Sequence, residues 1–130
     1  MIGLDSNVLV RLFAKDDADQ FKRAAVLLAS LKPEAPGFVS LVALAEIIWV
    51  LRRRYGMKRA EIARCLEHLL DSPEITLESE GAVAQAVVRF ENSKADFADC
   101  LIERSGSIGG CTNTVTFDAT AVKTAGMKLL

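Results

Sequence analysis

Histidine and cysteine are scarce in this sequence of 130 residues, which contains one histidine and three cysteines. With His68 as the single histidine, zinc sites of His and Cys and histidine-activated nucleophiles have almost no residues to draw on. The cysteines, Cys65, Cys100 and Cys111, are odd in number and far apart, which predicts reduced core residues rather than a disulfide framework or a CxxC metal site. If the chain is an enzyme, carboxylates must carry its chemistry.

The sequence also lacks an excess of one charge and a long hydrophobic run. Sixteen Lys and Arg face seventeen Asp and Glu, for a net charge of -1, so any nucleic-acid binding must come from a local patch. The longest apolar stretch, residues 39–51, is interrupted by Ser40 and Glu46 and is shorter than the roughly 20 residues of a membrane-spanning helix. The N-terminal segment lacks the basic first part of a signal peptide and has Asp5 where a signal peptide would be apolar. We therefore expect a soluble, cytoplasmic protein without a membrane partner.

The length and the hydrophobic content of 51% predict one domain with one core, residues 1–130. No internal repeat or low-complexity linker interrupts the chain, and its three prolines fall in short breaks between apolar segments. The same apolar content is high for one small core and predicts that part of the surface is covered by a partner.

Short strands are expected to alternate with longer helices. Apolar runs and turn residues predict strands at residues 1–4, 38–39, 74–77, 111–117 and 128–130. Helical spacing of apolar residues predicts helices at residues 8–13, 16–31, 41–55, 58–71, 79–90 and 96–105, with a short last helix after Asp118. This alternation indicates an α/β fold in which a short, mostly parallel sheet is flanked by helices.

Acidic residues occupy informative places in this pattern. Asp5 and Asp118 each follow an apolar strand and precede a helix, and ligands of parallel sheets bind at the carboxyl ends of the strands. We therefore expect these two carboxylates at the same sheet edge. Glu46 lies in a helix that is apolar almost all round, where a buried charge needs a partner. Instead of having a functional role, it could form an ion pair with an arginine such as Arg52 or Arg104.

Asp96 and Asp99 are three residues apart, which places them on one face of a helix near its N-terminus. Each acid also has a structural explanation, because Asp5, Asp96 and Asp118 are suitable N-caps and Asp99 would suit the helix dipole. Clustered carboxylates, however, repel each other and are tolerated mainly when cations hold them together. Their hard oxygen ligands select Mg²⁺ or Mn²⁺.

The order of these residues resembles the PIN-domain family, in particular the VapC-type toxins of bacterial toxin–antitoxin pairs. The resemblance rests on an ordered set of segments that spans the chain: Asp5-Ser6-Asn7, Glu46, Asp96-Phe97-Ala98-Asp99-Cys100-Leu101-Ile102, Gly110-Cys111 and Thr116-Phe117-Asp118. It implies a PIN-like fold and a metal-dependent endoribonuclease.

Matched position by position, the resemblance assigns the four acids of the family to Asp5, Glu46, Asp99 and Asp118. Asp96 matches an accessory acid, while Asn7 and Thr116 match polar positions that support the first and last aspartates. The implied mechanism has Asp5 and Asp99 as primary Mg²⁺ ligands, with Glu46 and Asp118 holding a second ion or an activated water. The resemblance also implies an RNA substrate, a small antitoxin partner and a homodimer.

Positive charge is concentrated in the first half of the chain, where residues 1–65 hold eleven Lys and Arg against seven acids. Its densest part is a basic cluster that consists of Arg52, Arg53, Arg54, Lys58 and Arg59. These side chains could bind RNA phosphates beside an acidic site. Alternatively, they interact with the dipole at a helix C-terminus and remain solvated.

Two other functions fit parts of the pattern. Asp5 at the end of a strand could be the nucleophile of a phosphatase or phosphotransferase, but haloacid-dehalogenase-like enzymes require a second aspartate where this chain has Asn7. Alternatively, the chain could be a non-catalytic α/β interaction module that binds a basic partner through its acidic pocket. Metal-dependent cleavage by the isolated protein would separate these functions from a nuclease.

Overall fold

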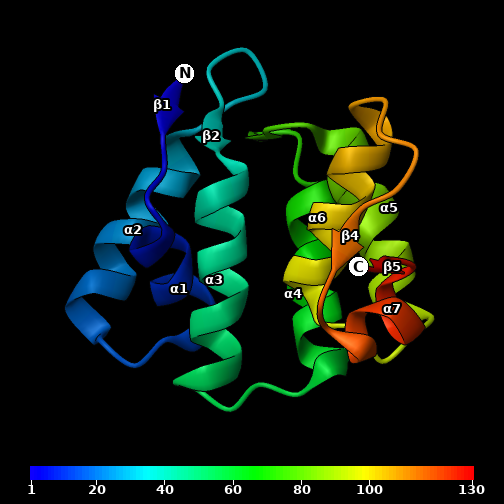
Figure 1. Ribbon diagram of the computed structural model, residues 1–130. Coiled ribbons are helices and arrows are strands. Elements are labelled where there is room, and N and C mark those ends of the chain that lie inside the picture. Colours follow the sequence, from blue (N-terminus) through cyan, green and yellow to red (C-terminus); the bar gives the residue numbers. More distant parts are fainter. The chain divides into compact units, whose positions relative to one another are not determined.

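The computed structural model describes residues 1–130, and Figure 1 labels its helices and strands. The chain consists of two compact units, Met1–Glu78 and Ser79–Leu130. Each unit is described by itself. Among the helices of residues 1–130, none combines the length and the apolar character that crossing a membrane requires.

The first unit combines a three-stranded parallel sheet with four helices. The strands are β1 (Ile2–Gly3), β2 (Gly37–Val39) and β3 (Ile75–Leu77), in the order β1-β2-β3. Ile2 pairs with Gly37, and Gly37 in turn pairs with Ile75, so the carboxyl ends of all three strands share one edge. The helices are α1 (Ser6–Ala14), α2 (Ala18–Ser30), α3 (Leu41–Arg53) and α4 (Arg59–Asp71). Asp5 and the helix α3 therefore both follow that edge directly.

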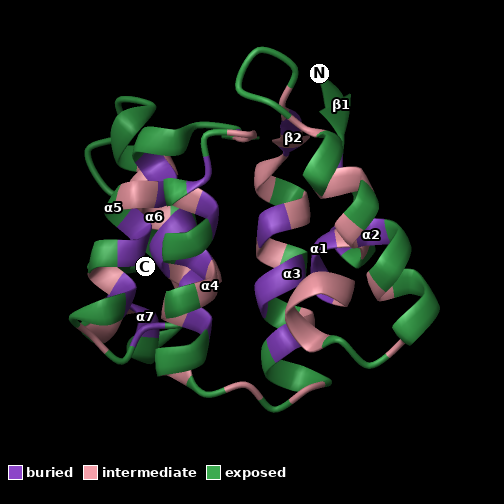
Figure 2. Cartoon of the chain, turned by 180° about the vertical axis from the view of Figure 1, so that it is seen from behind, coloured by how far each residue is buried: buried purple, intermediate pink, exposed green.

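The core of the first unit is aliphatic. Its completely buried side chains include Leu9, Leu44, Ile47, Leu51, Ile62 and Leu66. Figure 2 marks the buried parts of the chain in purple. In β2, Gly37 allows the backbone to approach the core closely, because a Cβ at this position would lie 2.7 Å from Cδ1 of Leu4. Packing of α1 against α3 fixes the direction in which both helices leave the sheet edge.

The second unit contains α5 (Glu80–Glu91), α6 (Phe97–Ile108), β4 (Val115–Thr116), α7 (Ala119–Ala125) and β5 (Lys128–Leu129). Helices α5 and α6 pack closely, with the rings of Phe90 and Phe97 edge to face at 6.0 Å. Strands β4 and β5 pair in parallel. Parallel strands that alternate with helices confirm the α/β class predicted from the sequence.

Three local predictions were wrong. The strand expected at residues 111–117 is limited to Val115–Thr116, and helix α6 continues past Ser105 and Gly106 to Ile108. A glycine weakens a helix without necessarily ending it, and α6 ends at Gly109–Gly110, where Gly110 has a φ of 94°. Cys111 is exposed rather than in the core.

The first and last aspartates follow strands of two different sheets. Asp5 follows β1 of the three-stranded sheet, whereas Asp118 follows β4, which pairs with β5 alone. Asp118 therefore follows a two-stranded ladder of its own unit, and the shared sheet edge expected for Asp5 and Asp118 stays a prediction.

Candidate active site

In the first unit, three side chains meet at the sheet edge. Asp5 is the N-cap of α1, and its Oδ1 accepts a hydrogen bond from the backbone N–H of Ser6 at 2.8 Å. The hydroxyl of Ser6 lies 3.4 Å from the same oxygen and donates to Oε1 of Glu46 at 2.5 Å. The buried hydroxyl of Ser6 thus links the carboxylate of Asp5, the N-cap of α1, to the carboxylate of Glu46 on α3.

Glu46 differs from the expectation of a buried charge. The buried stripe of α3 consists of Leu44, Ile47, Ile48 and Leu51, and Glu46 lies outside it with its carboxylate exposed. Its Oε1 accepts a hydrogen bond from the hydroxyl of Ser6. An exposed carboxylate beside Asp5 remains accessible to a cation.

In the second unit, Asp118 is the N-cap of α7. Its Oδ1 accepts hydrogen bonds from the backbone N–H groups of Thr120, at 2.8 Å, and Ala121, at 3.4 Å. Its own backbone N–H donates to Oγ1 of Thr116 at 3.0 Å. Thr116 therefore helps to fix the backbone of the last aspartate.

Asp99 lies in the first turn of α6 and is half-buried. Burial raises the pKa of its carboxyl group, and the negative charges of Asp96 and Asp118 raise it further. Asp96 occupies the N-cap position of α6, but its side chain makes no capping hydrogen bond to the helix. Asp99 is thus the acid whose ionised form the second unit disfavours most clearly.

These donors fit a divalent cation in chemistry. Every candidate ligand is a carboxylate oxygen, the donor type of Mg²⁺ and Mn²⁺, and a bound cation would offset the repulsion that Asp99 experiences. No group of three or more His, Cys, Asp or Glu side chains in the structure is close enough to hold a metal ion. Asp5 and Glu46 belong to the first unit, and Asp96, Asp99 and Asp118 to the second.

The basic cluster lies where α3 ends and α4 begins. Arg52, Arg53, Arg54 and Lys58 are exposed, whereas Arg59 is half-buried. Arg53 is seven residues beyond Glu46 on α3, which corresponds to about 10 Å along the helix axis. Asn7 is exposed on α1, and the hydrogen bonds to Asp5 come from Ser6 instead.

Ser6 is the residue that sequence reasoning missed. Its neighbour Asp5 is recognisable as the residue between a strand and a helix, whereas serine in the first turn of a helix is too common to be distinctive. Its burial was the feature that could have singled it out, and burial follows from the packing of α1 on α3 rather than from local sequence.

Comparison with known proteins gives a family match and matches to four chains of solved structures. The PIN domain family matches residues 2–127. One matching crystal structure is that of VapC20 from Mycobacterium tuberculosis, a toxin that cleaves the sarcin–ricin loop. Its sequence is 22% identical to this chain, and the match covers 98% of this chain and 97% of the VapC20 chain, with a TM-score of 0.48. No curated protein sequence matches this chain.

Proposed function

The chain belongs to the PIN-domain family, and from this premise we propose that it is a metal-dependent endoribonuclease, the toxin of a toxin–antitoxin pair. The observation that carries the proposal is the extent of the family match, because residues 2–127 contain every candidate acid. We further propose that both units together form one PIN-like domain over residues 1–130.

In this proposal, Asp5, Glu46, Asp99 and Asp118 bind Mg²⁺ or Mn²⁺ and carry the catalysis, with Asp96 as an accessory acid. Bound divalent ions supply Lewis acidity and a water nucleophile for hydrolysis of an RNA phosphodiester. The chain's own residues orient the carboxylates. Backbone N–H groups hold one oxygen of each capping aspartate, and the hydroxyl of Ser6 holds Glu46. The products expected from hydrolysis are a 5′-phosphate and a 3′-hydroxyl.

The test is cleavage of an RNA panel in Mg²⁺ and in EDTA. Asp5→Asn and Asp99→Asn should each abolish cleavage while the protein remains folded, and Asp71→Asn, which removes an exposed carboxylate at the end of α4, should leave cleavage unchanged. Equal cleavage by all variants would contradict the proposal. Binding of a basic partner without cleavage by the unmodified chain would instead support an interaction module.

A cavity of about 450 Å³ in the first unit supports the antitoxin partner. It lies among α1, α2 and α4 and is mostly apolar, with Leu12, Phe13, Phe21, Leu28 and Leu69 in its walls. We propose that an amphipathic helical segment of the antitoxin occupies this cavity, because apolar side chains on one face of such a helix can fill an apolar cavity. Titration with the antitoxin should suppress cleavage, and Leu12→Asp should weaken that suppression.

We also propose a homodimer. Several large apolar side chains are exposed, among them Val42 and Trp49, which are seven residues apart on one face of α3. Sedimentation equilibrium should give twice the mass of the chain, and Trp49→Glu should shift it toward the monomer. A purified chain that stays monomeric at all concentrations would contradict this part of the proposal.

A further inference from the structure

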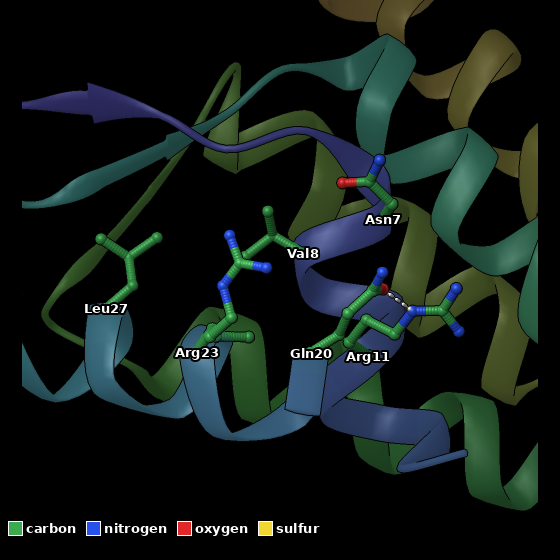
Figure 3. Close-up of a pocket in the computed structure, with 7 residues that line it drawn as sticks. Asn7, Val8, Arg11, Gln20, Arg23 and Leu27 are labelled. Atoms are coloured by element: carbon green, nitrogen blue, oxygen red, sulfur yellow. Dashed lines mark hydrogen bonds between the residues drawn. The ribbon is translucent and has the colours of Figure 1, made fainter. Parts of the chain in front are cut away.

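A second cavity in the first unit takes no part in the proposed chemistry. It encloses about 420 Å³ between α1 and α2 (Figure 3). Asn7, Val8 and Arg11 of α1 and Gln20, Arg23, Ala24 and Leu27 of α2 line it. Two guanidinium groups and two amides are among these seven side chains, and no carboxylate is. The lining therefore favours a ligand that is anionic and accepts hydrogen bonds.

Arg11 is a fixed wall of this cavity. Its Nη1 donates to Oδ1 of Asp16 at 2.7 Å and to the hydroxyl of Tyr55 at 3.1 Å, and its Nε donates to Oε1 of Gln20 at 2.5 Å. Because the oxygen of Gln20 accepts this bond, the amide nitrogen is the group of Gln20 that can donate to a ligand. The positions of both side chains are thus set before a ligand arrives.

Arg23 is the cation that a ligand can engage. Its guanidinium rises from α2 toward Val8 of α1 (Figure 3). The ion pair with Asp19 is 3.7 Å long and its two side chains are 77% and 81% exposed, so it stabilises little and competes weakly with an anion. A guanidinium forks onto two phosphate oxygens at once, which makes phosphate the anion that suits it best.

We propose that this cavity binds a backbone phosphate of the RNA substrate, beside the phosphate that is cleaved. The inference rests on the proposed function. Asn7, which lines the cavity, is two residues from Asp5, so the cavity and a carboxylate assigned to the metal share the N-terminal end of α1. An acidic catalytic edge repels RNA, and an adjacent guanidinium offsets that repulsion. Phosphate contacts of this kind position the strand without reading its sequence.

The test compares Arg23→Gln with Lys22→Gln, which removes an exposed cation next to it on α2 that does not line the cavity. Cleavage kinetics are measured on one RNA oligonucleotide that the unmodified chain cleaves, and binding of the same RNA is measured in EDTA over a series of KCl concentrations. Arg23→Gln should raise KM and Kd on the order of tenfold, since a hydrogen-bonded charge contact is lost, and should leave kcat close to that of the unmodified chain.

The salt dependence gives a readout that a structural defect would not produce. For a single strand, loss of one phosphate contact should lower the slope of log Kd against log salt by about 0.7. Arg23→Lys should keep the slope, because its charge remains, and should recover only part of the affinity. Lys22→Gln should behave like the unmodified chain.

The outcomes separate this inference from the proposed function. If the unmodified chain cleaves RNA and Arg23→Gln matches Lys22→Gln in KM and slope, the cavity does not bind the substrate while the nuclease assignment stands. If the unmodified chain neither binds nor cleaves any RNA of the panel, both proposals fail.

Discussion

Among single residues, Ser6 connects the two candidate acids of the first unit. Its side chain is buried, its hydroxyl donates to Glu46, and its backbone N–H donates to Asp5. A hydrogen bond of a buried hydroxyl to a charged group both stabilises the fold and fixes the acceptor. Ser6 should therefore affect stability and catalysis together.

Replacement of Ser6 by alanine removes the donor to Glu46 and leaves the backbone bond to Asp5. We expect the free energy of unfolding to fall by about 1 kcal/mol and RNA cleavage to slow, because Glu46 loses its orientation. Denaturant titration and cleavage kinetics measure the two effects. Ser30→Ala, whose exposed hydroxyl donates to the carbonyl of Leu27, serves as the control. Unchanged cleavage by Ser6→Ala would show that Glu46 needs no such support.

Asp99 should impair stability where it supports function. Folding raises the pKa of its carboxyl group. The protonated carboxyl group therefore contributes stability to the fold at a pH below the pKa of the unfolded chain. This contribution is lost as the pH rises through the higher pKa of the folded state. In metal-free buffer, Asp99→Asn should therefore be more stable than the unmodified protein at pH 7, with the difference shrinking toward pH 3. Thermal unfolding across this range measures it. A variant that is less stable at pH 7 would contradict the assigned repulsion.

The sequence identified the acids better than their surroundings. Asp5 and Asp118 were recognisable because a cap between strand and helix is a local feature, and both do cap a helix. For Asp96, the cap position was predicted, but its side chain makes no capping bond. The exposure of Glu46 was not predictable, because it depends on which side of α3 packs against α1.

Among the secondary-structure elements, the link from α1 to α2 is held by one polar cluster. Tyr55 donates to Oδ2 of Asp16 at 2.6 Å, and Arg11 donates to Oδ1 of the same residue. The hydrogen bond from Tyr55, and next that from Arg11, lower the pKa of Asp16 below its ordinary value of 3.8. This cluster also holds Arg11 in the wall of the proposed phosphate cavity.

Tyr55→Phe removes one hydroxyl from this cluster and should destabilise the protein at neutral pH. A carboxyl group with a lowered pKa contributes stability above its unfolded value, and this contribution is lost as the pH falls through the folded value. The difference between variant and unmodified protein should therefore be full above about pH 5 and shrink in more acidic solution. Urea titration at several pH values measures it. A difference that grows on acidification would contradict the assigned contacts.

Two glycines of the second unit should respond in opposite directions. Gly81 lies in α5 with open space around it, so Gly81→Ala should stabilise the protein by about 0.5–1 kcal/mol. Gly126 caps α7 with a φ of 79°, a left-handed backbone conformation that strains any residue with a Cβ. Gly126→Ala should destabilise by about 1–2 kcal/mol. Thermal unfolding of both variants tests the backbone assignments, and equal shifts would contradict them.

Long elements were easier to predict than short ones. The apolar spacing of residues 16–31, 41–55 and 58–71 located α2, α3 and α4 within two residues. The β-branched run at residues 111–117 predicted a strand that is too long, because strand pairing rather than propensity sets where a strand forms. Only Val115–Thr116 pairs with another strand.

For the whole molecule, the central claim is that carboxylates of both units hold divalent ions for one reaction. If Asp5 and Glu46 alone bound the ion, substitutions in the second unit would leave metal affinity unchanged. If the acids act together, the loss of one carboxylate from either unit should weaken binding sharply, because each is a charged ligand of the same site.

Calorimetric titration of Mn²⁺ into the metal-free protein tests this claim most directly. The account predicts binding to the unmodified chain and to Asp71→Asn, and loss of that binding in both Asp5→Asn and Asp99→Asn. Retention of full Mn²⁺ affinity in Asp5→Asn or in Asp99→Asn, with the variant folded, would contradict it.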